Sequence, residues 1–141
     1  MTFFLTIITG FSIFVLGQFF LKLVLEPIVA FKESLGSLSA FCLRNRASIT
    51  NAAATLEEQN ELRLIVSTIL SKKHAIPFYS QLSSVLGLPS SENLLLACQN
   101  LNFVAYEMYK ETTMTKQYGQ IVFKLHETSK LLGLRLDFEA L

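Results

Sequence analysis

The chain has 141 residues, of which 51% are apolar and only 16% are charged. This length predicts one folded domain in addition to any membrane segment. The net charge of +1 argues against nucleic-acid binding, because a phosphate-binding surface needs a large excess of Lys and Arg.

The first 21 residues carry no charged side chain. A helix of this length rises about 31 Å, the thickness of the hydrocarbon core of a bilayer. A cleaved signal peptide would place Lys or Arg before the apolar run and small residues at a cleavage site after it. No Lys or Arg precedes this run, and "QFFLKLVLEP" offers no such site. The pattern therefore predicts an uncleaved transmembrane helix over residues 1–25, with the lipid bilayer as its partner.

Two lysines are predicted to mark the membrane interface. Lys22 closes the apolar run, and its long side chain can carry the ammonium group to the lipid headgroups. Lys32, Arg44 and Arg46 all follow the span. The positive-inside rule then predicts that the N-terminus lies outside and that the following domain is cytoplasmic.

Small and polar side chains collect on one face of the predicted span. A helical wheel places Thr6, Thr9, Gly10, Ile13 and Gly17 within about 100° of one another. Small residues four apart let helix backbones approach closely in lipid, so this face predicts self-association. Two alternatives remain open: a chance cluster of residues common in membrane helices, or a threonine-lined pore in a larger oligomer.

Glu26-Pro27 interrupts the helix, and either a kink or the first turn of a new helix is expected there. A juxtamembrane helix is predicted over residues 26–46. Its apolar positions alternate in steps of three and four, which is the coiled-coil period: Val24, Ile28, Phe31, Leu35 and Leu38. This seam either joins two chains or packs on the helical domain of its own chain.

An all-α domain is predicted after a loop at 47–54. Thr55 and Glu58 form a capping-box pattern, Ser90 is an N-cap, and Gly87 and Gly133 end helices. Residues 55–133 are therefore predicted to form a cytoplasmic bundle of four helices, with a tail at 134–141.

No motif for catalysis, nucleotide binding or metal binding occurs in the sequence. His74 and His126 lack ligand-type neighbours at helical spacing and are expected at the surface. Cys42 and Cys98 could form a disulfide, but buried free thiols are favoured in a reducing compartment. No enzyme activity, cofactor, metal or small-molecule substrate is expected. Lys72-Lys73 is interpreted as a helix C-terminus, with a phospholipid contact as the alternative.

Four short motifs carry a resemblance to other proteins. They are Glu26-Pro27-Ile28, Leu62-Arg63, Ile76-Pro77-Phe78-Tyr79 and Pro89, in this order. Over about residues 15–110 the chain resembles a group of small uncharacterised bacterial single-pass membrane proteins. The resemblance implies a bacterial or phage-related inner-membrane protein with a cytoplasmic helical domain, and it implies no reaction or ligand.

Two hypotheses follow. The first is a membrane-anchored adaptor, scaffold or subunit of a membrane complex, which holds a helical bundle at the inner membrane. The alternative is a self-oligomerising membrane effector that forms a pore or perturbs the bilayer, as a toxin or defence protein would.

Overall fold

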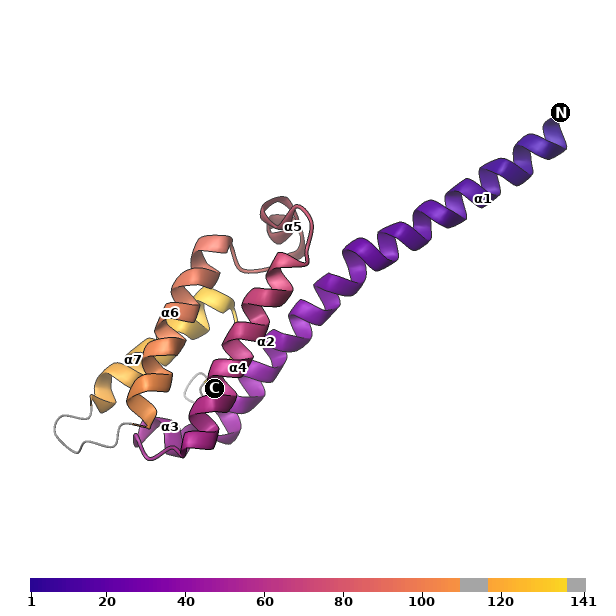
Figure 1. The fold of residues 1–141 in the computed structure, drawn as a ribbon. Helices are drawn as coiled ribbons and strands as arrows, with labels where there is room; N and C mark the ends of the chain where they lie inside the picture. The colour runs from indigo at the N-terminus through magenta and orange to yellow at the C-terminus, as the bar shows by residue number, and fades with distance from the viewer. Residues whose placement is uncertain (110–116, 137–141) are drawn as a thin grey trace.

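The computed structural model describes residues 1–109 and 117–136, and these residues form an all-α fold without a β-strand (Figure 1). The elements in chain order are α1 (Thr2–Phe20), η1 (Leu21–Leu25), α2 (Glu26–Arg44), α3 (Arg46–Thr50), α4 (Leu56–His74), α5 (Tyr79–Leu86), α6 (Ser91–Met108) and α7 (Tyr118–Leu132).

The segments α1, η1 and α2 follow one another without a loop and form one helical run up to Arg44. Pro27 lies in the first turn of α2 and has no N–H to donate. A π-helical turn precedes it, in which the Glu26 N–H reaches back to the Leu21 carbonyl. Such a turn commonly bends a helix, and Figure 1 shows that α1 and α2 run in different directions. The bend therefore lies at the predicted place, in the turn before the proline.

The bundle is built by successive packing of α2 on α4, α4 on α6, and α6 on α7. Each helix buries one apolar face, as its sequence pattern predicts. The largest fully buried side chains are Phe31, Leu38, Phe41, Ile49, Leu62, Ile69, Leu94, Leu101, Val104, Met108, Ile121 and Leu136. α4 and α6 are the inner helices of this series, because each packs against two others.

Polar contacts fix the register of these helices. The Gln59 side chain is buried and donates from Nε2 to the Ala105 carbonyl at 2.7 Å, which joins α4 to α6. Asn100 on α6 donates to the Glu127 carboxylate on α7 at 2.9 Å. A hydrogen bond inside a protein is directional, so these pairs select one arrangement among many that bury similar apolar area.

The helix ends follow the predicted signals. The Thr55 hydroxyl accepts from the Glu58 N–H, and the Glu58 carboxylate accepts from the Thr55 N–H, which completes the capping box. Ser90 caps α6 through the Asn93 N–H. Gly87 and Gly133 both adopt the left-handed conformation that ends a helix.

The predicted loop at 47–54 is wrong in its first half, because α3 occupies Arg46–Thr50. The sequence there is polar and small except for Ile49, which is completely buried and holds this short helix on the core. Burial of one side chain thus decided the conformation of a segment with weak local preferences.

The predicted tail at 134–141 also contributes to the core in its described part. Leu136 is 1% exposed, and Leu134 packs against the core cluster. The polar segment 108–120 is predicted to hold a turn, and its residues 110–116 lie outside the described residues, as do residues 137–141.

Candidate functional site

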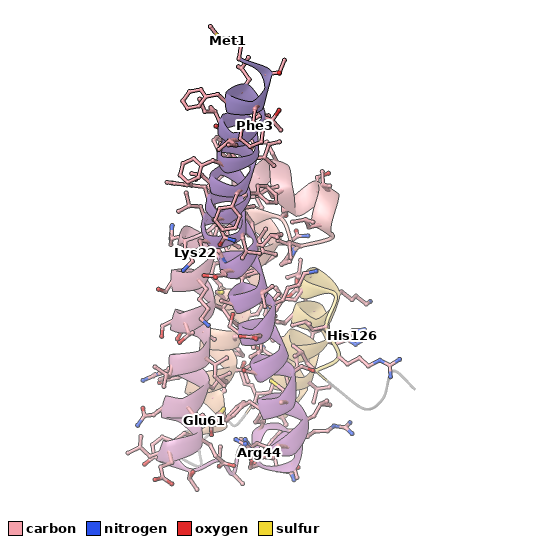
Figure 2. All side chains as sticks on the ribbon, turned by 90° about the vertical axis from the view of Figure 1, so that its right-hand side faces the viewer. Met1, Phe3, Lys22, Arg44, Glu61 and His126 are labelled. Atoms are coloured by element: carbon pink, nitrogen blue, oxygen red, sulfur yellow. The ribbon has the colours of Figure 1, made fainter. Side chains whose placement is uncertain are left out.

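The N-terminal helix α1 buries none of its residues against the rest of the chain. Its phenylalanines are exposed, from 80% at Phe3 to 57% at Phe20. Figure 2 shows side chains projecting from this helix beyond Lys22, away from the bundle. The chain thus contains one N-terminal helix that is long and apolar enough to span a membrane.

The predicted association face of α1 is open along its length. Beyond its chain neighbours and the backbone of its own helix, an added Cβ at Gly10 or Gly17 would meet no atom within 4 Å. Thr6 donates its hydroxyl to the Thr2 carbonyl at 2.9 Å, and Thr9 donates to the Leu5 carbonyl at 2.8 Å. The two hydroxyl protons are used within the helix, so these threonines do not need water or a second chain as acceptors.

The predicted seam has a different place in the structure. Ile28, Phe31, Leu35 and Leu38 are at most 6% exposed and belong to the core of the chain's own bundle. Val24 is half-buried and packs against the same core. The seam therefore packs within its own chain, and the alternative that it joins two chains is wrong. An apolar stripe at coiled-coil spacing cannot distinguish these cases, because both bury the same face.

Lys22 and Lys32 are both exposed. Lys22 follows α1 directly, whereas Lys32 lies on the outer face of α2, beside the buried Phe31. Lys72 and Lys73 lie in the last turn of α4, as predicted for a helix C-terminus. The Lys73 ammonium lies 5.5 Å from the centre of the Tyr79 ring, within the range of a cation–π contact.

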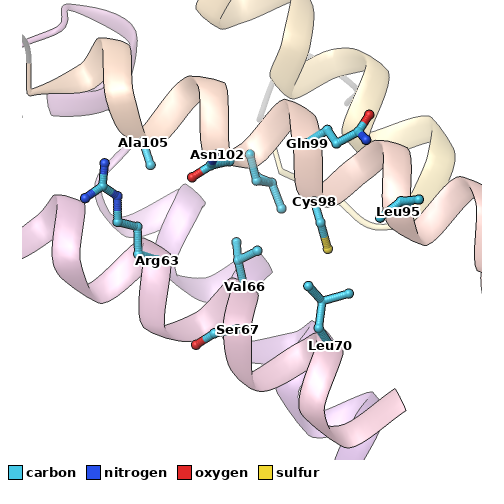
Figure 3. A pocket seen from close by; sticks show the side chains of 10 residues that line it. Arg63, Val66, Ser67, Leu70, Leu95, Cys98, Gln99, Asn102 and Ala105 are labelled. Carbon is cyan, nitrogen blue, oxygen red and sulfur yellow. The ribbon is translucent and has the colours of Figure 1, made fainter. Parts of the chain in front are cut away.

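A groove between α4 and α6 was not predicted (Figure 3). It has a volume of about 440 Å³. The residues on its α4 side are Arg63, Val66, Ser67 and Leu70, and those on its α6 side are Leu95, Cys98, Gln99, Leu101, Asn102 and Ala105.

The groove leaves apolar side chains of both helices accessible. Val66 and Leu70 continue the apolar stripe of α4 that includes the buried Leu62 and Ile69, but they are only half-buried. Four further apolar residues widen the apolar surface of α6: Val104 is fully buried and Phe103 is half-buried, whereas Leu95 and Leu96 are 55% and 40% exposed. Adjacent helix positions differ by about 100° in direction, and the inner face of α6 is already occupied by Leu94 and Leu101. The sequence signal for this groove is an apolar stripe that is wider than one neighbouring helix can cover.

The cysteines are both free and buried. Burial raises the pKa of Cys42 to about 12 and that of Cys98 to about 11. A thiol that stays protonated at neutral pH is a poor nucleophile, so neither side chain has the character of a catalytic cysteine.

Other residues of catalytic or metal-binding type are dispersed. His74 and His126 are exposed and lie on different helices. Within the described parts of the chain, no group of three His, Cys, Asp or Glu side chains could hold a metal ion. The apolar surfaces that remain open on the described chain are the span, its Thr/Gly face and the α4–α6 groove.

Comparison with protein-family models, with curated proteins and with solved structures finds no match. The resemblance to small bacterial membrane proteins thus stays a prediction.

Proposed function

We propose that the chain is a membrane-anchored interaction protein, which holds its helical bundle at the inner face of the bacterial inner membrane for another protein to bind. The observation that carries this proposal is the continuity of α1 and α2. One half of this helical run is apolar and unburied, and the other half forms part of the bundle core. A bundle attached without a loop is restricted in how it can orient toward the membrane, which suits a scaffold.

The α4–α6 groove is the surface that suits a partner. Its floor is apolar, from Val66 and Leu70 to Leu101, and Arg63 lies at one end (Figure 3). Grooves of this kind bind amphipathic helices, whose apolar side chains enter at positions i, i+3 or i+4, and i+7. We assign the groove to a helix of a second protein that carries such a stripe and a carboxylate near Arg63.

A photo-crosslinking amino acid tests this assignment in native membranes. Leu95 lies in the groove and Leu64 lies outside it on α4, and the two side chains are 55% and 66% exposed. The expected result is one discrete adduct from position 95, absent at position 64, with a mass that differs from twice that of the chain. An adduct of twice the chain mass would favour self-association, and equal labelling at both positions would contradict the groove assignment.

The alternative, a self-oligomerising membrane effector, is favoured by one observation, the open Thr/Gly face of α1. Since the Thr6 and Thr9 hydroxyls donate to carbonyls of their own helix, this face presents small side chains whose hydroxyl protons are already bonded. This favours close helix–helix packing in lipid over a water-filled pore.

The combined substitution Gly10→Leu and Gly17→Leu tests that alternative, since both positions have free space and the bundle is not disturbed. If this face drives assembly, the full-length protein in detergent changes from a defined oligomer to a monomer. Phe4→Leu with Phe11→Leu, on the other side of α1, is the matched control. An oligomer that survives the glycine substitutions would exclude this face as the interface.

A further inference from the structure

A second surface lies where the bundle meets the predicted membrane border. Residues 75–91, "AIPFYSQLSSVLGLPSS", contain no charged side chain and include all of α5. The segment follows directly on Lys72, Lys73 and His74. An uncharged stretch next to lysines is typical of a segment that lies in the lipid–water interface.

The apolar side chains of this segment are divided between the core and the outside. Tyr79 is buried, and Leu82 packs against the core cluster. Phe78 and Val85 are 77% and 81% exposed. These two large apolar side chains lie seven residues apart, which is two helical turns, and no part of the described chain covers them.

Phe78 is unusual in its backbone as well. It adopts the left-handed conformation, with φ of 52° and ψ of 39°, which a side chain with a Cβ rarely occupies. The turn therefore holds a large aromatic residue in a disfavoured conformation with its ring outside. Strain of this kind often marks a site where another molecule is contacted.

The position of α5 indicates that the molecule contacted by Phe78 is lipid. The core of the bundle extends along the long helix to Val24, two residues after Lys22. The Tyr79 ring contacts Phe31, nine residues after Lys22 and about 13 Å further along the helix. Figure 1 shows α5 at the end of the bundle from which α1 departs, and Figure 2 shows the same end near the level of Lys22.

We propose that α5 and the turn before it form a second membrane contact, in which Phe78 and Val85 enter the lipid–water interface. Lys72 and Lys73 end the helix that precedes this contact, and the Lys73 ammonium lies 5.5 Å from the centre of the Tyr79 ring, so positive charge that complements anionic lipid headgroups lies next to α5. The contact would fix the rotation of the bundle about the span, and so the direction in which the α4–α6 groove faces. The inference rests on the proposed membrane anchor.

The absence of tryptophan from the chain allows a direct test. Three single-tryptophan variants of the full-length protein are reconstituted into phosphatidylcholine–phosphatidylglycerol vesicles, with and without brominated acyl chains. Phe14→Trp reports on the span, Phe78→Trp on the proposed contact, and Phe123→Trp is the control. Phe123 is 63% exposed on α7 and is thus matched to Phe78 in residue type and exposure.

Brominated lipid is expected to quench Phe14→Trp strongly and Phe78→Trp by about twofold, since interfacial residues reach the acyl boundary. Phe123→Trp should keep its emission. If Phe14→Trp is quenched but Phe78→Trp resembles Phe123→Trp, the second contact is overturned while the anchor stands. If Phe14→Trp is not quenched, the anchor itself fails, and this inference fails with it. A blue-shifted but unquenched Phe78→Trp would mean that protein covers the residue, which also overturns the lipid contact.

Discussion

The rings of Phe31 and Tyr79 meet edge to face, with centroids 5.7 Å apart and planes at 81°. This contact joins α5 to the long helix that begins in the apolar N-terminal segment. Tyr79 also donates its hydroxyl to the Pro89 carbonyl at 2.7 Å, which ties α5 to the start of α6. One aromatic pair thus fixes the short helix at the end of the bundle from which α1 departs.

Tyr79→Phe removes the hydroxyl and keeps the ring contact. The Pro89 carbonyl then lies in a buried site without this donor, so the free energy of unfolding should fall by about 1–2 kcal/mol. Denaturant unfolding of the full-length protein in detergent, followed by circular dichroism, measures this change. Tyr118→Phe is the control, since Tyr118 is 48% exposed. An equal effect of both substitutions would contradict the role of the Pro89 contact.

Phe31→Ala should lower the free energy of unfolding by about 3–5 kcal/mol, because it leaves a cavity in a fully buried site. This loss of unfolding free energy should not depend on protein concentration, since the seam that contains Phe31 packs within one chain. A seam that joined two chains would give a free energy of unfolding that rises with protein concentration. Val29→Ala, at a neighbouring position that is 55% exposed, should have little effect.

Gln59→Glu places a carboxylate against the Ala105 carbonyl in a buried site. Burial without a donor raises the folded-state pKa of the new carboxyl above its unfolded value, so the folded state binds more protons. The variant should approach wild-type stability at pH values below about 4 and lose about 2 kcal/mol or more toward neutral pH. Urea unfolding at a series of pH values measures this slope. The exposed Gln120→Glu should follow the wild type throughout.

Thr55→Ala removes the hydroxyl that accepts from the Glu58 N–H at 3.2 Å. The expected loss is about 1 kcal/mol in thermal or denaturant unfolding, and Thr55→Ser should restore most of it. The Thr55 backbone N–H, which donates to the Glu58 carboxylate, is the largest cause that lowers the pKa of Glu58. The Glu58 carboxylate therefore contributes to the free energy of unfolding above pH 4.5, and this contribution is lost as the pH falls through the lowered folded-state pKa.

The buried thiols predict a loss of stability at alkaline pH. Unfolded thiols ionise near pH 9.0, whereas burial raises the pKa to about 12 for Cys42 and about 11 for Cys98. The folded state holds more protons in this window, so stability falls as the pH rises, by up to about 1.4 kcal/mol per pH unit for each thiol. Cys42→Ala should make the slope between pH 9 and 11 less steep. Leu38→Ala should lower stability without changing the slope, and a Cys42→Ala slope equal to wild type would contradict the prediction.

Local signals in the sequence predicted the parts of the structure that depend on near neighbours. The capping box at Thr55 and Glu58, the Ser90 cap and the glycine ends of α5 and α7 all formed as predicted. Each depends on hydrogen bonds or backbone conformation within a few residues, so a short sequence specifies it. The apolar first helix and the bend before Pro27 belong to the same class.

The sequence by itself determined that the chain is all-α, that its first helix is apolar, and where most helices end, because these properties follow from local composition and spacing. Only the tertiary structure decided that Phe31 and Leu38 face their own bundle, that Ile49 holds α3 on the core, and that Leu95 borders a groove. A buried position is defined by the segment that covers it, and that segment can lie anywhere along the chain. For this reason the pattern indicated which faces are apolar, and the fold decided what each face touches.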